Sequence, residues 1–234
     1  MIKKIINILS LKKKSFLSKK ISYSYNGVDL IISYLFQKER RGTYVDVGAQ
    51  NPISNNNTFL LFKKGWRGLN IDLDNENIKL FNIARPLDKN FKFAVSDKKG
   101  EKKLFFYHDK SPINTLVKKV SRFQKAKISK IENIKVVTLN YILSLTNIKK
   151  IDFLNIDVEG HELEVLKGFD LKTFKPKVIN VEFLDLSMKN LHLRNNDLNK
   201  IIKSDLYRYL IRRNYHLINW LHGDLIFVHS DLRD

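Results

Sequence analysis

Residues that could bind a ligand or move a proton lie at or just beyond the carboxyl end of each of five predicted β-strands. They are Asp46, Gly48 and Ala49 at the first strand, Asp72 at the second, Ser96 and Asp97 at the third, Asp157, Glu159 and His161 at the fourth, and Glu182 at the fifth. In an open α/β sheet, ligands bind beyond the carboxyl ends of the strands. The spacing therefore predicts one ligand site, rich in carboxylates, at a single edge of the sheet.

The stretch from Tyr44 to Asp72 has the pattern of a nucleoside-binding half-site. A β-prone run over 43–47 ends at a glycine turn, and a helix over 59–64 leads to a second strand over 68–72. A glycine turn lets a ligand approach the main chain, and the start of the following helix offers N–H groups. Asp72, at the tip of the second strand, is placed to accept hydrogen bonds from ribose hydroxyls.

The turn itself argues against a phosphate ligand. Only Gly48 occurs in it, so the G-x-G-x-x-G fingerprint is absent, and the chain has no Gly-Lys-Ser/Thr phosphate loop. Asp46 would repel a pyrophosphate and attract a cation, so a nucleoside with a cationic group, such as S-adenosylmethionine, fits better. Simpler structural roles stay open, with Asp46 as a turn-capping acid and Asp72 as the N-cap of a helix that begins near Asn75.

The elements that must position these residues alternate between strand and helix, which predicts an α/β fold with a parallel sheet. Further strands are expected over 91–95, 103–107, 135–139, 151–157, 177–183, 215–219 and 225–229. Further helices are expected over 28–38, 75–84, 141–145, 162–167 and 199–213. The polar stretch 108–132 is expected to be a long loop.

Composition sets the class of the protein. The chain has 234 residues, of which 43% are hydrophobic, and it contains no cysteine, which suits a reducing compartment such as the cytoplasm. We expect a basic N-terminal extension over 1–22 and a single domain over 23–234. The net charge of +19 comes with abundant Lys, Asn and Ile, as in proteins from AT-rich genomes, so much of the Lys is expected on solvated faces.

Several segments together resemble the FkbM-type methyltransferase family, over about residues 43–182. The segments are Asp46-Val47-Gly48-Ala49, Pro52, Asn57-Thr58, Gly65-Trp66-Arg67-Gly68, Asp72, Arg85-Pro86 with Asp88, Ala94-Val95-Ser96-Asp97, Asn114-Thr115 and the run 151–162. The Asp-Val-Glu-Gly-His-Glu segment at 157–162, together with Gly-Trp-Arg-Gly, makes the resemblance specific. The chain departs from the family at Gln50-Asn51, where relatives often carry histidines, and at Asn56, where serine is common.

The resemblance implies a class I methyltransferase fold, Rossmann-like, with a mostly parallel seven-stranded sheet, an antiparallel last strand and helices on both faces. It also implies S-adenosylmethionine as cofactor and O-methylation of a sugar hydroxyl in a glycan, polysaccharide or glycosylated metabolite. Residues expected to bind the cofactor are Asp46, Gly48, Ala49, Asn57, Asp72, Ser96, Asp97 and Asp157.

Methyl transfer to a hydroxyl is expected to need a general base. His161 is the first candidate because its ordinary pKa lies nearest neutrality, and Asp157 or Glu159 would orient it or accept the proton directly. A first-turn helix residue exposed to water is the simpler reading of His161. A divalent cation held by Asp157, Glu159 and Glu182 is a rival interpretation, and we expect no metal.

Two other functions remain as alternatives. The charge, with the basic helix around Arg208, Arg212 and Arg213, would suit an RNA-binding protein or RNA methyltransferase, although no base-flipping motif or aromatic–basic recognition module is present. The lysines around the apolar run 5–9 would suit a peripheral enzyme at an anionic membrane, such as the inner membrane surface, acting on a lipid-linked sugar. The apolar run is too short to span a bilayer.

Overall fold

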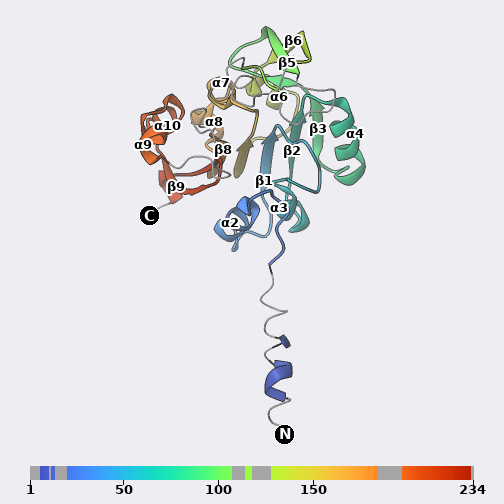
Figure 1. Ribbon diagram of the computed structural model, residues 1–234, viewed down its shortest axis with the longest axis vertical. Coiled ribbons are helices and arrows are strands. Elements are labelled where there is room, and N and C mark those ends of the chain that lie inside the picture. Colours follow the sequence, from blue (N-terminus) through green and yellow to red (C-terminus); the bar gives the residue numbers. More distant parts are fainter. Residues whose placement is uncertain are drawn as a thin grey trace.

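The computed structural model describes residues 6–10, 12–13, 20–106, 114–117, 128–183 and 197–232. A seven-stranded sheet forms the centre of the domain, with helices around it and a small second sheet at one end (Figure 1). The strands of the main sheet are β1 (Thr43–Val47), β2 (Arg67–Asp72), β3 (Lys89–Lys92), β7 (Phe153–Ile156), β8 (Val178–Glu182), β9 (Tyr215–Leu221) and β10 (Asp224–His229). The helices are α2 (Val28–Leu35), α3 (Phe59–Lys63), α4 (Asn75–Ala84), α6 (Leu139–Ser144), α7 (Glu162–Lys167), α8 (Leu171–Phe174), α9 (Leu198–Lys203), α10 (Asp205–Ile211) and the 3-10 turn η1 (Ser230–Leu232).

The strand order in the main sheet is β3-β2-β1-β7-β8-β10-β9. The first five strands in this order run parallel to one another, and β10 runs antiparallel to both β8 and β9. This confirms the expected seven-stranded, mostly parallel sheet with an antiparallel last strand. The order reverses beside β1, which pairs with β2 on one side and β7 on the other, so a ligand is expected beyond the ends of β1 and β7.

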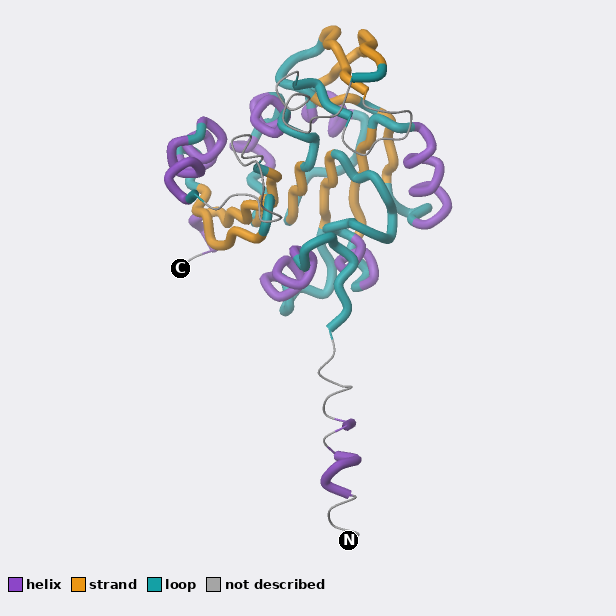
Figure 2. The backbone as a smooth tube through the Cα atoms, in the orientation of Figure 1, coloured by secondary structure: helices purple, strands orange, loops and turns teal. Residues whose placement is uncertain are grey.

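Alternation along β1 supplies residues to two hydrophobic cores. Val45 and Val47 join the larger core, which includes residues of α6, α7 and α10. Tyr44 joins the smaller core with Trp66 and residues of α2. Because successive strand residues face opposite sides, the two cores lie on opposite faces of the sheet. Helices therefore cover both faces, as expected, and the strands lie between them (Figure 2).

The predicted third strand, 91–95, is divided between two sheets. β3 pairs with β2, whereas β4 (Ala94–Val95) pairs with β6 (Lys130–Val137) in a small sheet of order β4-β6-β5, where β5 is Gly100–Phe106. At the break, the N–H of Phe93 donates to the carbonyl oxygen of Asp72 at 3.0 Å. One extended run thus leads from the main sheet into the small sheet, and the end of the predicted loop 108–132 belongs to β6.

The predicted basic helix 199–213 is two helices, because Ser204 interrupts it with an extended backbone conformation. The Ser204 hydroxyl donates to the carbonyl oxygen of Ile201 at 2.6 Å and accepts from the N–H of Tyr207 at 3.2 Å. Serine is a preferred N-cap residue because its oxygen can satisfy an N–H group of the first helical turn. Ser204 therefore ends α9 and begins α10.

The N-terminal region is helical over 6–10 and 12–13, and its apolar side chains are exposed, with Ile6 58% and Leu9 60% accessible. Ser22 contacts the domain, because its hydroxyl donates to Asp29 Oδ1 at 2.6 Å. The boundary expected between 22 and 23 stays a prediction. Among the residues that the structure describes, no helix is both long and apolar enough to cross a bilayer.

Candidate active site

Two rows of residues cross the main sheet near the carboxyl ends of its strands. The lower row consists of Asn90, Asn70, Asp46, Asn155 and Asn180, which are paired in register from β3 to β8. The upper row consists of Lys92, Asp72, Gly48, Asp157 and Glu182, each two residues further along its strand or just beyond it. Residues two apart in a strand face the same side, so the lower row forms a floor beneath the upper row.

Gly48 directly follows β1 and has a left-handed backbone conformation, with φ of +83°. A Cβ atom on Gly48 would lie 1.7 Å from the carbonyl oxygen of Asp157, so no side chain fits there. The N–H groups of Gly48 and Ala49 both donate to the carbonyl oxygen of Ile71, at 2.9 and 3.0 Å. The turn is thereby held between the ends of β2 and β7, and these two amides serve the turn rather than a ligand.

The Asp72 carboxylate lies at the tip of β2 and lines the same cavity as Gly48. Its Oδ2 accepts from the N–H of Gln50 at 2.8 Å, and its Oδ1 accepts from the N–H of Asp74 at 2.7 Å and from Asn77 Nδ2 at 3.1 Å. Burial raises the pKa of Asp72, and these donors oppose the rise. A carboxylate offers about four acceptor positions, so Asp72 is held in place and still has capacity for a ligand hydroxyl.

Asp46 lies below the turn, with only 1% of its surface exposed. Its Oδ1 accepts from Asn155 Nδ2 at 2.8 Å, and its Oδ2 accepts from Thr58 Oγ1 at 2.8 Å and Asn56 Nδ2 at 3.2 Å. Burial raises the pKa of Asp46, and the hydrogen bonds and a nearby arginine oppose the rise. These contacts do not support the expected direct contact of Asp46 with a cofactor. They correspond more closely to the simpler reading of a turn-holding acid.

Arg85 compensates this buried charge, a role that the sequence did not indicate beyond the family resemblance. It is fully buried, and its guanidinium donates to Thr58 Oγ1 at 2.9 Å, to Asn56 Oδ1 at 2.7 Å and, through Nε, to the carbonyl oxygen of Pro52 at 2.9 Å. The rings of Phe59, Phe62 and Phe81 lie 5.3, 5.2 and 5.0 Å from it. Such ring contacts favour a cation. Arg85 thus holds the loop between β1 and α3 through Pro52, Asn56 and Thr58.

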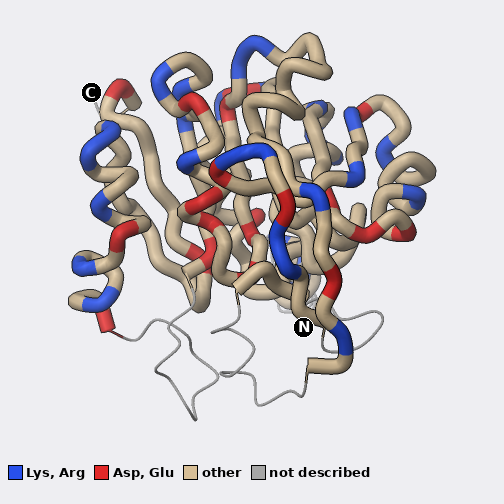
Figure 3. Tube along the Cα trace, turned by 90° about the horizontal axis from the view of Figure 1, so that it is seen from above, with Lys and Arg blue, Asp and Glu red and all other residues tan. Residues whose placement is uncertain are grey.

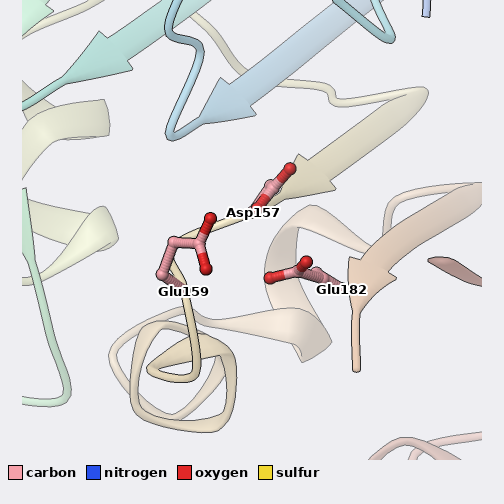
Figure 4. A group of neighbouring side chains, drawn as sticks. All are labelled: Asp157, Glu159 and Glu182. Carbon is pink, nitrogen blue, oxygen red and sulfur yellow. The ribbon is translucent and has the colours of Figure 1, made fainter. Parts of the chain in front are cut away.

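Asp157, Glu159 and Glu182 come together as expected. Their carboxylates point toward one another from the end of β7, the loop that follows it and the end of β8 (Figure 4). One oxygen from each lies within 4.8 Å of the others. Burial raises the pKa of Asp157 well above its ordinary value, and the carboxylates of Glu159 and Asp224 raise it further. Such a group of acids retains a proton or attracts a cation.

His161 lies apart from this cluster, immediately before α7, and is 5% exposed. Its Nε2 lies 2.9 Å from Ser96 Oγ, which donates its one hydrogen to Asp97 Oδ1 at 2.9 Å, so Nε2 is the donor to the hydroxyl. Its Nδ1 lies 3.7 Å from Glu164 Oε2, and burial lowers the pKa of His161. These contacts direct the ring to the turn after β4. Because the ring is buried, the simpler reading of His161 as a residue exposed to water is wrong.

The remaining candidate residues do not line the cavity. Ser96 and Asp97 form the turn that His161 contacts, and Lys102 Nζ lies 3.6 Å from Asp97 Oδ1. Asn57 donates to Asn155 Oδ1 at 3.1 Å and so belongs to the floor. Ala49 is buried, with 3% of its surface exposed. Around the cavity as the described residues define it, the structure brings Gly48, Asp72, Asp157 and Glu159 together and leaves these others behind its wall.

The cavity has a volume of about 900 Å³, within the range of small-molecule sites. One wall comes from the ends of β1, β2 and β7. The facing wall comes from the small sheet and the residues beside it, a contribution that the sequence did not assign. Its members are Leu104, Phe106, Asn114, Leu116, Glu132, Ile134 and Lys135. In the sequence, only the long polar stretch expected over 108–132 indicated that a segment between two strands could form part of a binding site.

A model of the methyltransferase FkbM domain matches residues 46–209, which is more than half of the chain. The chain belongs to the FkbM methyltransferase family. The matched region of this FkbM domain begins at Asp46 and includes Asp72, Asp157 and Glu182, so both rows of the sheet lie entirely within it.

Solved structures give further relatives of this FkbM domain. The chain is similar to the methyltransferase FkbM from Methylobacillus flagellatus KT, with 16% identity and a TM-score of 0.48 over 80% of this chain, and it spans 44% of that protein's length. It is also similar to a TehB-like SAM-dependent methyltransferase from Corynebacterium glutamicum ATCC 13032, with 11% identity and a TM-score of 0.44 over 95% of this chain and 96% of that one. No curated protein matches the chain.

Proposed function

We propose that this chain is an S-adenosylmethionine-dependent O-methyltransferase that methylates a sugar hydroxyl of a glycan, polysaccharide or glycosylated metabolite. The observation that carries the proposal is the shared cavity of Gly48, Asp72 and the acids after β7, at the point where the strand order reverses. The family membership supports the methyl-transfer chemistry. The sugar acceptor rests on the family resemblance alone.

The residues present fit this cofactor. Asp72, held by three donors, offers an oxygen to a ribose hydroxyl. The buried charge of Asp46 beneath the turn and the acids of the cavity favour a cation over a phosphate. When bound, S-adenosylmethionine supplies a methyl group on a positively charged sulfur.

The general base of the proposed reaction is one of the acids after β7. Asp157 and Glu159 line the cavity, and Glu182 lies beside them. Because crowding and burial raise the pKa of Asp157, its carboxylate binds a proton more readily than an ordinary aspartate and can receive one from an acceptor hydroxyl. His161 then acts by positioning the loop that carries Glu159.

Calorimetry with S-adenosylhomocysteine tests the proposal. We expect wild-type protein to bind and Asp72→Ala to bind roughly 10- to 100-fold more weakly, since a ribose hydroxyl loses its acceptor. Asp170→Ala is the matched control, because Asp170 also accepts main-chain N–H bonds, from Lys172 and Thr173 at 3.1 and 3.0 Å, but lies outside the cavity. Wild-type protein that fails to bind, or undiminished affinity of Asp72→Ala, would exclude this assignment of the site.

We also propose that the N-terminal segment binds an anionic membrane surface. The exposed Ile6, Ile8 and Leu9 lie among Lys residues, a pattern that suits a lipid surface. Deletion of residues 2–20 should abolish pelleting with phosphatidylserine vesicles and leave binding of S-adenosylhomocysteine unchanged. Equal pelleting of both proteins would remove the membrane proposal.

The RNA alternative has less support. In the view of Figure 3, the Lys and Arg positions are spread over several segments of the chain trace rather than gathered on one. Affinity for a single-stranded RNA that falls steeply with salt would favour it, because phosphate contacts release counterions. No binding near physiological salt would count against it.

A further inference from the structure

Thr115 connects the small sheet to the loop that carries Glu159. Its hydroxyl donates to the carbonyl oxygen of Glu159 at 2.6 Å and accepts from the N–H of Val117 at 3.0 Å. Its main chain pairs with Phe105 of β5 through two hydrogen bonds, of 2.9 and 3.2 Å. Thr115 is 1% exposed, so this contact is shielded from water.

The loop that receives this hydrogen bond has an unusual backbone. Glu159 and Gly160 both have positive φ, of 56° and 94°. For a glutamate this conformation costs free energy, and it persists only where neighbouring contacts hold it. From the side of α7, Glu162 Oε1 accepts from the N–H of Val158 at 3.2 Å and of Gly160 at 2.8 Å. From the other side the contact comes from Thr115, so the loop is held between helix and small sheet.

We infer that Thr115 is a positioning residue for methyl transfer. Its hydroxyl, on the side of the small sheet, fixes the Glu159 carbonyl and so directs the Glu159 carboxylate toward Asp157. The inference rests on the proposed function of the cavity. The flanking residues Asn114 and Leu116 line that cavity, as does Glu159 itself. The same hydrogen bond therefore sets the spacing between the two walls at the acidic end, where the acceptor must lie.

The test compares Thr115→Val, which removes the hydroxyl at nearly constant size, with Thr115→Ser, which keeps it. Thr146→Val is the matched control, because Thr146 also donates to a carbonyl oxygen, of Leu143 at 2.8 Å, and accepts from an N–H two residues on, of Ile148 at 3.2 Å. The readouts are hydrogen exchange over 157–162, affinity for S-adenosylhomocysteine, and transfer of labelled methyl to surface glycans from a source strain that lacks the gene.

For Thr115→Val we expect faster exchange over 157–162, a kcat lowered roughly 10- to 100-fold, and a KM for S-adenosylmethionine within about threefold of wild type. Thr115→Ser and Thr146→Val should behave like wild type. Wild-type exchange and kcat in Thr115→Val, or equal losses in Thr115→Ser, would overturn the inference. If wild-type protein binds no S-adenosylhomocysteine, the proposed function fails, whereas the exchange measurement still decides whether the Thr115 hydroxyl holds the loop.

Discussion

Arg85 and Asp46 are joined through the hydroxyl of Thr58, which lies 2.9 Å from Arg85 Nη1 and 2.8 Å from Asp46 Oδ2. Asn56 makes a second bridge, since its Oδ1 accepts from Arg85 and its Nδ2 donates to Asp46. A buried cation and a buried anion thus hold the loop between β1 and α3 without touching each other. The loop in turn fixes the glycine turn at the cavity.

Replacing Arg85 with methionine should destabilise the protein by roughly 3–5 kcal/mol, because Asp46 is left buried without its compensating charge. Arg85→Lys should fall between wild type and Arg85→Met, since an ammonium keeps the charge but cannot reach three acceptors at once. Urea denaturation measures both variants. Adding Asp46→Asn to Arg85→Met should recover part of the loss, and strict additivity of the two changes would refute the coupling.

The stability of the protein should fall as pH rises between about 4.5 and 7 because of Glu162. Burial raises the pKa of Glu162 to about 7 from an ordinary value of 4.5. In that window the folded state binds more protons than the unfolded state, so the free energy of unfolding decreases with pH, by on the order of 3 kcal/mol in total. Glu162→Gln keeps an oxygen for the N–H groups of Val158 and Gly160, and its unfolding free energy should vary less over the same range. An identical pH dependence in both proteins would contradict this.

Gly48→Ala should abolish cofactor binding and destabilise the fold by at least about 1–3 kcal/mol. The new Cβ would meet the Asp157 carbonyl oxygen at 1.7 Å, and the residue has a φ of +83° that alanine adopts with strain. Gly100→Ala is the control, because nothing lies within 4 Å of its Cβ position. Thermal unfolding and calorimetry with S-adenosylhomocysteine are the measurements. Normal cofactor binding by Gly48→Ala would contradict the prediction, because it would show that the turn can move away from the Asp157 carbonyl oxygen without losing the site.

Chelation with EDTA should leave methyl transfer unchanged. The repulsion among Asp157, Glu159 and Glu182 can be relieved by one proton shared among the three carboxyl groups, without a divalent cation. The measurement is the rate of label transfer before and after dialysis against EDTA at constant ionic strength. A loss of rate that Mg²⁺ restores, and that Glu182→Gln makes irreversible, would establish the metal interpretation instead.

Local signals were sufficient for much of the fold. The glycine turn, the strand at 43–47 and the helix at 75–84 were predicted with the bounds that the structure gives. The basic stretch 199–213 is expected from the sequence as one helix, whereas the Ser204 side chain caps a new helix in the structure. The run 91–95 was predicted as one strand because β propensity does not reveal that two sheets share it.

The sequence by itself determined the order of the elements, the turn and the presence of an acid beyond successive strands, because these depend on residues close together in the chain. Only the tertiary structure decided which acids share the cavity. Asp46 is withdrawn beneath the turn by partners at positions 56, 58 and 155, and His161 is drawn toward Ser96, 65 residues earlier. Asp72, Asp157 and Glu159 reach one cavity because strand pairing brings the ends of β2, β1 and β7 to the same edge, a contact between distant segments that no local pattern encodes.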